Sequence, residues 1–123
     1  MSKKIFLCDD NVPILETLGM VLSMTDAIIV SESKSSEALE RLSEENPDLF
    51  ICDLWMPELS GEDLIKQIRT HREFDNMYIL CISASYEGKE IALKAGADYF
   101  LPKPFEMNEL LSIVNNVLAS GRL

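Results

Sequence analysis

Carboxylates, a hydroxyl and an ammonium group follow short apolar runs at several points along the chain, and together they could carry out phosphoryl transfer. These residues are Asp9, Asp10, Asp53, Ser83 and Lys103. Moving a phosphoryl group to a carboxylate requires an in-line nucleophile and neutralisation of the charge on the equatorial oxygens. Asp53 is the candidate nucleophile, Lys103 offers a cation, and Ser83 offers a hydroxyl donor.

The three aspartates also predict a metal ion. Carboxylates that are brought together repel one another, which raises their pKa values unless a cation is bound. Mg²⁺ suits ligation by carboxylates, a backbone carbonyl, water and phosphate, and Mn²⁺ can substitute for it. Taken singly, Asp9 or Asp10 reads as a helix cap or a solvated charge, Ser83 as a turn former and Lys103 as a surface charge. Their recurrence at matching ends of four runs favours a common site.

The apolar runs predict the sheet that must position these groups. They cover residues 5–8, 27–30, 49–52, 78–82 and 99–101, and segments with helical spacing follow each of them. Runs without polar alternation are typical of parallel strands that helices cover on both faces. Strand then helix, repeated five times, predicts an α/β fold with a doubly wound five-stranded parallel sheet. Ligands bind such sheets at the carboxyl ends of the strands, where the marked residues stand.

The residues that start and stop helices agree with this interpretation. Asn11 can cap the first helix, with Pro13 in its first turn. Asn46 and Pro47 stop the second helix, and Gly96 fits the end of the fourth.

Composition favours one domain over residues 1–123, because 123 residues at 47% hydrophobic content can form one adequate core. The net charge of −10 opposes binding to phosphate backbones, so we expect no direct nucleic acid partner. No run approaches the length of a membrane span, and we expect a cytoplasmic protein. Cys8, Cys52 and Cys81 have no C-x-x-C spacing and read as buried thiols in a reducing compartment.

Several motifs occur in register along about residues 3–118. They are Asp9-Asp10-Asn11, Asp53-Leu54-Trp55-Met56-Pro57 with Gly61, Ser83-Ala84, and Gly96-Ala97-Asp98 leading to Lys103-Pro104-Phe105. In this order they resemble the receiver domains of bacterial two-component response regulators, the CheY-like family. The resemblance implies a flavodoxin-like (βα)5 fold with strand order 2-1-3-4-5.

The resemblance also implies residue roles. Asp53 would be the phosphoryl acceptor, Asp10 and Asp53 would bind Mg²⁺ directly, and Asp9 would bind it directly or through water. The backbone carbonyl of Trp55 would complete the protein ligands. Lys103 would pair with one phosphoryl oxygen, and the Ser83 hydroxyl would donate to another.

In such domains the signal is transmitted by the hydroxyl residue and by an aromatic residue on the last strand, which match Ser83 and Phe100. Phe100 can equally well be interpreted as a core residue with no signalling role. Because it lacks a hydroxyl, any switch must work by packing. The interval from Ser83 to Lys103 is about two residues shorter than the resemblance implies, so the loop or helix between them is expected to be trimmed.

Four further expectations surround the site. Lys103-Pro104 matches the family's cis peptide bond, and Pro102 departs from the small residue expected before the lysine. Pro102 removes a backbone donor, which an edge strand tolerates. Trp55 and Ser85 are assigned to the lifetime of the phosphoryl group, Trp55 as a shield against water or, equally, as an anchor for a partner.

The sequence therefore predicts a signalling module rather than an enzyme, with Mg²⁺-dependent self-phosphorylation and slow autodephosphorylation only. A histidine kinase or a histidine phosphotransfer protein would supply the phosphoryl group. The output would be a downstream protein target, a lost effector domain or a phosphorylation-dependent dimer. Two alternatives are a degenerate receiver that acts as a constitutive interaction module, and a haloacid-dehalogenase-like phosphatase. Trp55 stands where that phosphatase needs its second acid.

Overall fold

A computed structural model describes residues 3–84 and 87–120. The strands are β1 (Lys4–Cys8), β2 (Ile28–Glu32), β3 (Leu49–Asp53), β4 (Tyr78–Ser83) and β5 (Tyr99–Pro102). The helices are α1 (Val12–Leu22), α2 (Ser35–Glu45), α3 (Gly61–Arg69), α4 (Gly88–Ala95) and α5 (Met107–Ser120), with a short 3-10 turn, η1 (Arg72–Phe74).

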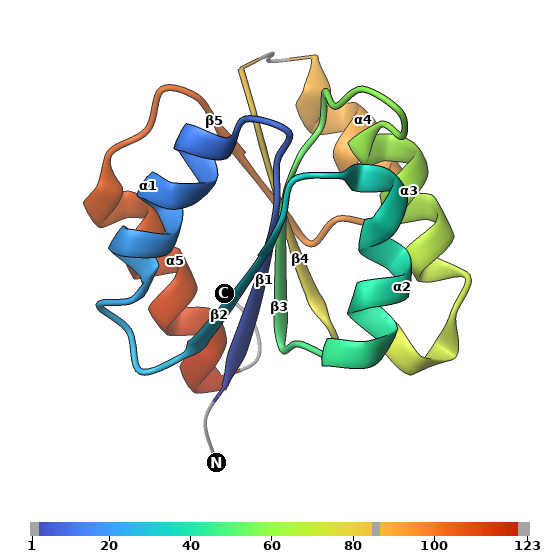
Figure 1. Cartoon of the computed structure of the whole chain (residues 1–123). Coiled ribbons are helices and arrows are strands. Elements are labelled where there is room, and N and C mark those ends of the chain that lie inside the picture. Colours follow the sequence, from blue (N-terminus) through green and yellow to red (C-terminus); the bar gives the residue numbers. More distant parts are fainter. Residues whose placement is uncertain (1–2, 85–86, 121–123) are drawn as a thin grey trace.

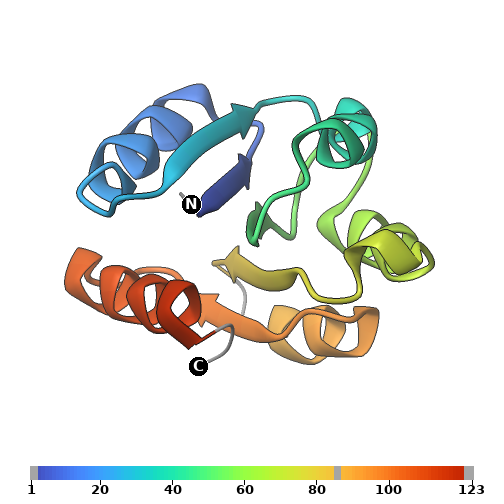
Figure 2. The ribbon, with the colours of Figure 1, turned by 90° about the horizontal axis from the view of Figure 1, so that it is seen from below.

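The strands form one parallel sheet in the order β2-β1-β3-β4-β5, which confirms the predicted fold and strand order. Helices α1 and α5 cover one face, and α2, α3 and α4 cover the other (Figures 1 and 2). All five strands run in the same direction, so their carboxyl ends meet at one edge. That edge lies at the top of Figure 1.

Side chains that alternate along each strand build two apolar cores. Phe6, Phe50 and Ile79 belong to the core beneath α2, α3 and α4. Ile5 and Leu49, which precede them on β1 and β3, belong to the core beneath α1 and α5. The strands of a sheet that is covered on both faces need no polar alternation, and this explains the apolar runs in the sequence.

The predicted helix boundaries are confirmed. The Asn11 side chain caps α1 by accepting a hydrogen bond of 3.2 Å from the backbone N–H of Ile14. Asn46 ends α2 in the left-handed conformation at φ 48°, and Gly96 ends α4 at φ 124°.

The second strand differs from its prediction. β2 spans Ile28–Glu32 instead of residues 27–30, because its pairing with β1 continues from Lys4↔Ile28 to Cys8↔Glu32. The polar end is stabilised by Arg41, whose Nη1 lies 3.0 Å from the Glu32 carboxylate. Apolar content alone does not mark this end of an edge strand, whose side chains are partly exposed.

Pro102 lies on β5, which is an edge strand as predicted. In a parallel ladder, every second residue of a strand donates its N–H to the same neighbouring strand. The Asp98 N–H donates to the Ile79 carbonyl of β4, so the next two donors toward β4 would be residues 100 and 102. Proline has no N–H, and the Lys103 N–H donates to the Ser83 carbonyl instead, at 2.8 Å. Pro102 thus shifts the last ladder bond onto the lysine.

Arg69 ties the end of α3 to the α4–β5 turn. Its Nε donates to the Gly96 carbonyl at 2.9 Å, its Nη1 to the Phe74 carbonyl at 3.0 Å, and its Nη2 to the Asp98 carboxylate at 2.8 Å. The same carboxylate accepts a 2.8 Å bond from the Ile79 N–H at the start of β4. This network fixes the amino ends of β4 and β5 relative to each other, at the edge of the sheet opposite the carboxyl ends.

Candidate functional site

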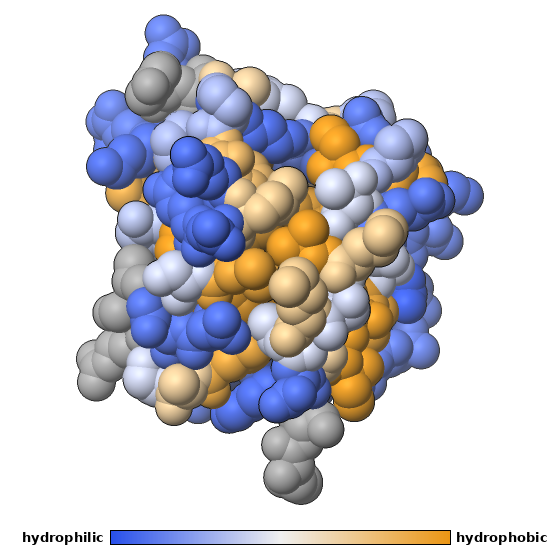
Figure 3. Space-filling model, turned by 90° about the vertical axis from the view of Figure 1, so that its left-hand side faces the viewer, coloured by the Kyte–Doolittle hydropathy of each residue, from blue (hydrophilic) through white to orange (hydrophobic). Residues whose placement is uncertain are grey.

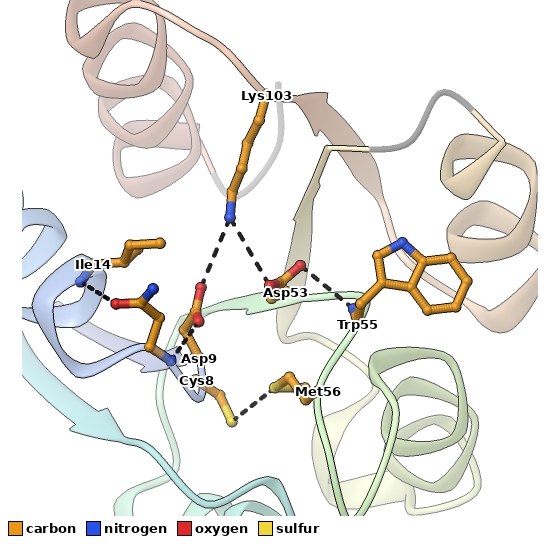
Figure 4. A network of polar contacts seen from close by, with 8 residues as sticks. Cys8, Asp9, Ile14, Asp53, Trp55, Met56 and Lys103 are labelled. Carbon is orange, nitrogen blue, oxygen red and sulfur yellow. Dashed lines mark hydrogen bonds and ion pairs between the residues drawn. The ribbon is translucent and has the colours of Figure 1, made fainter.

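Three carboxylates converge at the carboxyl edge of the sheet. Two of them, Asp9 and Asp53, are drawn in Figure 4. β1 and β3 are neighbours, and their Cys8↔Cys52 pairing places Asp9 beside Asp53. One carboxylate oxygen from each of Asp9, Asp10 and Asp53 lies within 4.8 Å of the others. The Asp9 and Asp53 side chains are largely buried, whereas Asp10 is exposed.

Lys103 reaches the same point from the end of β5. Its Nζ lies 4.0 Å from the Asp9 carboxylate and 3.9 Å from the Asp53 carboxylate. Figure 4 shows the lysine side chain extended between these two groups. One ammonium group facing three carboxylates leaves an excess of negative charge, and both lysine contacts are long for ion pairs.

Backbone N–H groups orient two of the acids. Asp9 accepts a 2.9 Å bond from the Asn11 N–H, so the turn that caps α1 also fixes this carboxylate. Asp53 accepts a longer bond, 3.4 Å, from the Trp55 N–H. Each bond leaves carboxylate oxygens able to bind a ligand at the sheet edge.

Burial raises the pKa values of both Asp9 and Asp53. For Asp9 the Asn11 N–H bond opposes this shift, and the charge of Asp53 adds to it. For Asp53 the Lys103 ammonium opposes the shift, and the charge of Asp10 adds to it. Buried carboxylates that resist ionisation, with oxygen atoms close together, fit a hard divalent cation. Its charge would offset both the cost of burying the carboxylate charges and the repulsion between them.

The loop after β3 is closed tightly at its base, next to Asp53. The Gly61 N–H donates to the Leu54 carbonyl at 2.8 Å. A Cβ at Gly61 would lie 2.3 Å from the Asp53 carbonyl oxygen, so only glycine permits this approach. Sequence reasoning missed Ser35, whose hydroxyl bonds this loop from α2. A serine at a helix start reads as a cap, and a partner 22 residues away gives no local signal.

Ser83 and Phe100 both lie in the interior. Ser83 ends β4 with its side chain fully buried, and Phe100 is part of the core beneath α2–α4. A Cβ at Gly88 would lie 3.3 Å from the Phe100 ring, so the start of α4 rests directly on it. α4 has eight residues, and the expected shortening of the segment between Ser83 and Lys103 stays a prediction. Ser85, the second position assigned to phosphoryl lifetime, lies outside the described residues.

Two further expectations can be located. The Lys103–Pro104 peptide bond is cis, as the resemblance implies. Trp55 is 55% exposed, and its indole projects away from Asp9 and Lys103 (Figure 4).

An apolar cleft of about 590 Å³ opens beside the carboxylates, between α1 and the start of α5. Asp9, Asp53 and Lys103 line it. Its apolar walls include Ile14, Leu18, Pro104, Phe105 and Met107. The cleft is therefore continuous with the charged site.

The cysteines match their prediction as buried free thiols. Burial raises the pKa of the Cys8 thiol to about 12, and a hydrogen bond to Cys81, together with burial, raises that of Cys52. Thiols in this state are poor nucleophiles and poor metal ligands. They act as small apolar residues of the core.

The fold and the acidic edge together define a receiver-type signalling domain. The sequence-family model for the response regulator receiver domain matches residues 5–115, and this chain belongs to that family. It is 32% identical to the response regulator MprA of Mycobacterium ulcerans over 100% of this chain and 53% of MprA.

Solved structures agree with this assignment. A putative response regulator from Chloroflexus aurantiacus matches with a TM-score of 0.90 and 30% identity, over 97% of this chain and 99% of that one. The chemotaxis response regulator CheY4 of Vibrio cholerae matches with a TM-score of 0.88 and 25% identity, over 96% and 100%.

The chain spans about half the length of the curated relatives it matches. Across residues 3–84 and 87–120, no helix is long and apolar enough to cross a bilayer.

Proposed function

We propose that residues 1–123 form one receiver domain that accepts a phosphoryl group on Asp53 and signals through altered protein contacts. The observation that carries this proposal is the convergence of three carboxylates within 4.8 Å, with the Lys103 ammonium beside them. A phosphoryl group requires this combination of a carboxylate nucleophile and compensating cations.

Mg²⁺ is the proposed cofactor, and Mn²⁺ can replace it. Asp10 and Asp53 would hold it directly, Asp9 directly or through water, and the Trp55 carbonyl would complete the set. When bound, the ion neutralises charge on the phosphoryl oxygens. The all-oxygen donor set and the raised pKa values of Asp9 and Asp53 support this assignment.

The chain's own residues have separate roles in the transfer. A carboxylate oxygen of Asp53 attacks phosphorus in line while the bond from phosphorus to the donor breaks. The Lys103 ammonium pairs with one equatorial oxygen, and the Ser83 hydroxyl donates to another. Trp55 occupies the place of a general acid, so rapid turnover as a phosphatase is not expected.

Intact-mass spectrometry after incubation with acetyl phosphate and Mg²⁺ tests the proposal. We expect one phosphoryl adduct on the parent protein, none on Asp53→Asn, and none on the parent in excess EDTA. A parent protein without an adduct would favour the constitutive interaction module instead. An adduct on Asp53→Asn would place the acceptor elsewhere.

The proposed output uses Ser83 and Phe100. Phosphorylation would draw the Ser83 hydroxyl toward the phosphoryl group, and the Phe100 ring would move into the vacated space. Because the ring lies against Gly88, its movement would displace the start of α4. The target would be a downstream protein, an effector domain outside this chain or a second phosphorylated copy.

The proposed donor is a protein that carries phosphohistidine, a histidine kinase or a phosphotransfer protein, and we propose that it docks on α1. This helix has one charged residue, Glu16, whereas 26% of the residues of the whole chain are charged. On the helix Met20 is 74% and Val12 48% exposed, and Met24, just after it, is 77% exposed. Figure 3 shows apolar side chains gathered across the face formed by α1 and α5.

An exposed apolar patch of this kind marks an interaction site. The cleft beside α1 leads from this face to Asp53, so a donor seated there would be next to the acceptor. The free, buried thiols fit a reducing compartment, and we propose a cytoplasmic location on that ground.

A further inference from the structure

The first turn of α2 is bonded to the loop that follows Asp53. Ser35 is 3% exposed, and its hydroxyl donates to the Pro57 carbonyl at 2.9 Å. The same oxygen accepts a 3.1 Å bond from the Leu59 N–H. The Ser35 side chain therefore satisfies two backbone groups of the turn formed by residues 57–59, and this turn belongs to a different β/α unit.

That turn is a strained one. Glu58, at its centre, has φ 70°, a left-handed conformation that residues other than glycine rarely adopt. The Leu59 N–H also lies 2.8 Å from the Pro57 carbonyl, so the chain reverses within three residues. A conformation of this kind persists only where its surroundings hold it, and the Ser35 hydroxyl is the buried group that does so.

The turn and one of the proposed metal ligands, the Trp55 carbonyl, share one closed loop. Its base is the bond from the Gly61 N–H to the Leu54 carbonyl, which leaves residues 55–60 within a single ring. Trp55, whose carbonyl is a proposed ligand, lies at one side of this ring and the turn at the other. A turn released from Ser35 would let the whole ring shift, including the Trp55 carbonyl.

We infer that Ser35 is a positioning residue for the metal site and acts through the loop of residues 54–61. This inference rests on the proposed function, because it concerns the site that Asp53 and Trp55 would share. Ser35 touches neither the metal nor the phosphoryl group. It plays the role of the outer hydrogen-bond partners that orient metal ligands.

Mg²⁺ titration of the full chain tests the inference, with the fluorescence of Trp55 as the signal. Trp55 is the only tryptophan of the chain, so the signal comes from the loop itself. We expect Ser35→Ala to weaken Mg²⁺ binding about tenfold, the lower end of the range for outer partners of metal ligands. The matched control is Ser36→Ala. Ser36 bonds the exposed Glu58 carboxylate at 2.6 Å, and its loss leaves no buried group unpaired, so we expect the affinity of the parent.

The outcomes separate this inference from the proposed function. A parent protein that does not respond to Mg²⁺ would contradict the proposed function. A parent that binds Mg²⁺ with the same affinity as folded Ser35→Ala would overturn the role of Ser35 alone. Equal losses in Ser35→Ala and Ser36→Ala would also overturn it, because they would show an effect that is not specific to the buried hydroxyl.

A second pair of variants covers the case in which Ser35→Ala does not fold. Glu58→Gly removes the strain at φ 70°, since glycine adopts this conformation freely. We expect Glu58→Gly to fold with or without Ser35→Ala. Glycine relieves the strain but does not fix the turn, which the two Ser35 bonds still hold in place, so we expect the tenfold difference in Mg²⁺ affinity to persist between these two proteins. Identical affinities in this background would contradict a positioning role.

Discussion

Removing the negative charge of Asp53 should stabilise the metal-free protein. At the 4.8 Å limit that contains the three carboxylates, two like charges repel by about 3–4 kcal/mol at an effective dielectric constant of about 20. Asp53 faces two such neighbours, Asp9 and Asp10. Lys103, at 3.9 Å, offsets roughly one of these repulsions. Solvent and salt reduce the remainder, so we expect Asp53→Asn to raise the free energy of unfolding by about 1–2 kcal/mol at pH 7.

Urea denaturation in EDTA measures this gain. Asp26→Asn is the matched control, because it removes the same charge from an exposed position outside the site, and we expect a change within about 0.5 kcal/mol. In millimolar Mg²⁺ the difference in the free energy of unfolding between Asp53→Asn and the parent should narrow or reverse, because only the parent protein has the complete ligand set and is stabilised by binding. An Asp53→Asn protein that is no more stable than the parent in EDTA would refute this electrostatic reasoning.

The pH dependence has a definite sign. Because the pKa of Asp53 is raised in the folded state, the folded protein still holds the proton at pH values where the unfolded chain has lost it. Stability from this group therefore falls as pH rises from the usual value of 3.8 through the raised pKa. The advantage of Asp53→Asn should grow across that window and be complete above it. If the stability difference between Asp53→Asn and the parent is constant with pH, the charge of Asp53 is not the cause of that difference.

Three other substitutions test separate parts of the structure. Arg69→Lys keeps the charge but loses the fork that bonds three acceptors, so we expect about 1–3 kcal/mol of destabilisation in urea. Exposed Arg72→Lys should have little effect. Met20→Lys should slow transfer from a phosphohistidine protein while leaving acetyl phosphate equally effective, and Leu93→Lys on α4 should change neither rate. Trp55→Ala should leave the lifetime of the aspartyl phosphate unchanged, because the indole projects away from the site, and a shorter lifetime would support shielding.

The sheet and the acidic cluster could be predicted because each rests on local signals. Apolar runs mark strands that are buried on both faces, and parallel strands bring their carboxyl ends together whatever the loops contain. Asp9 and Asp53 therefore converge as expected, and the caps at Asn11 and Asn46 follow from side-chain chemistry within one turn.

Contacts between distant segments could not be predicted in the same way. Ser35 reads as part of a helix start, and only the packing of α2 beside the β3–α3 loop shows its bonds to Pro57 and Leu59. Arg69 reads as a basic residue at the end of a helix, yet it joins three segments. The extension of β2 to Glu32 depends on pairing with β1, which outweighs the polar character of that segment.

Beryllofluoride binding is the most direct test of the central claim, that a divalent cation and Lys103 together hold a phosphoryl-like anion against Asp53. Fluorine NMR should show bound beryllofluoride on the parent protein in Mg²⁺, and none on the parent in EDTA, on Asp53→Asn or on Lys103→Met. Binding that persists without Mg²⁺ or without the lysine, or no binding to the parent in saturating Mg²⁺, would contradict this account.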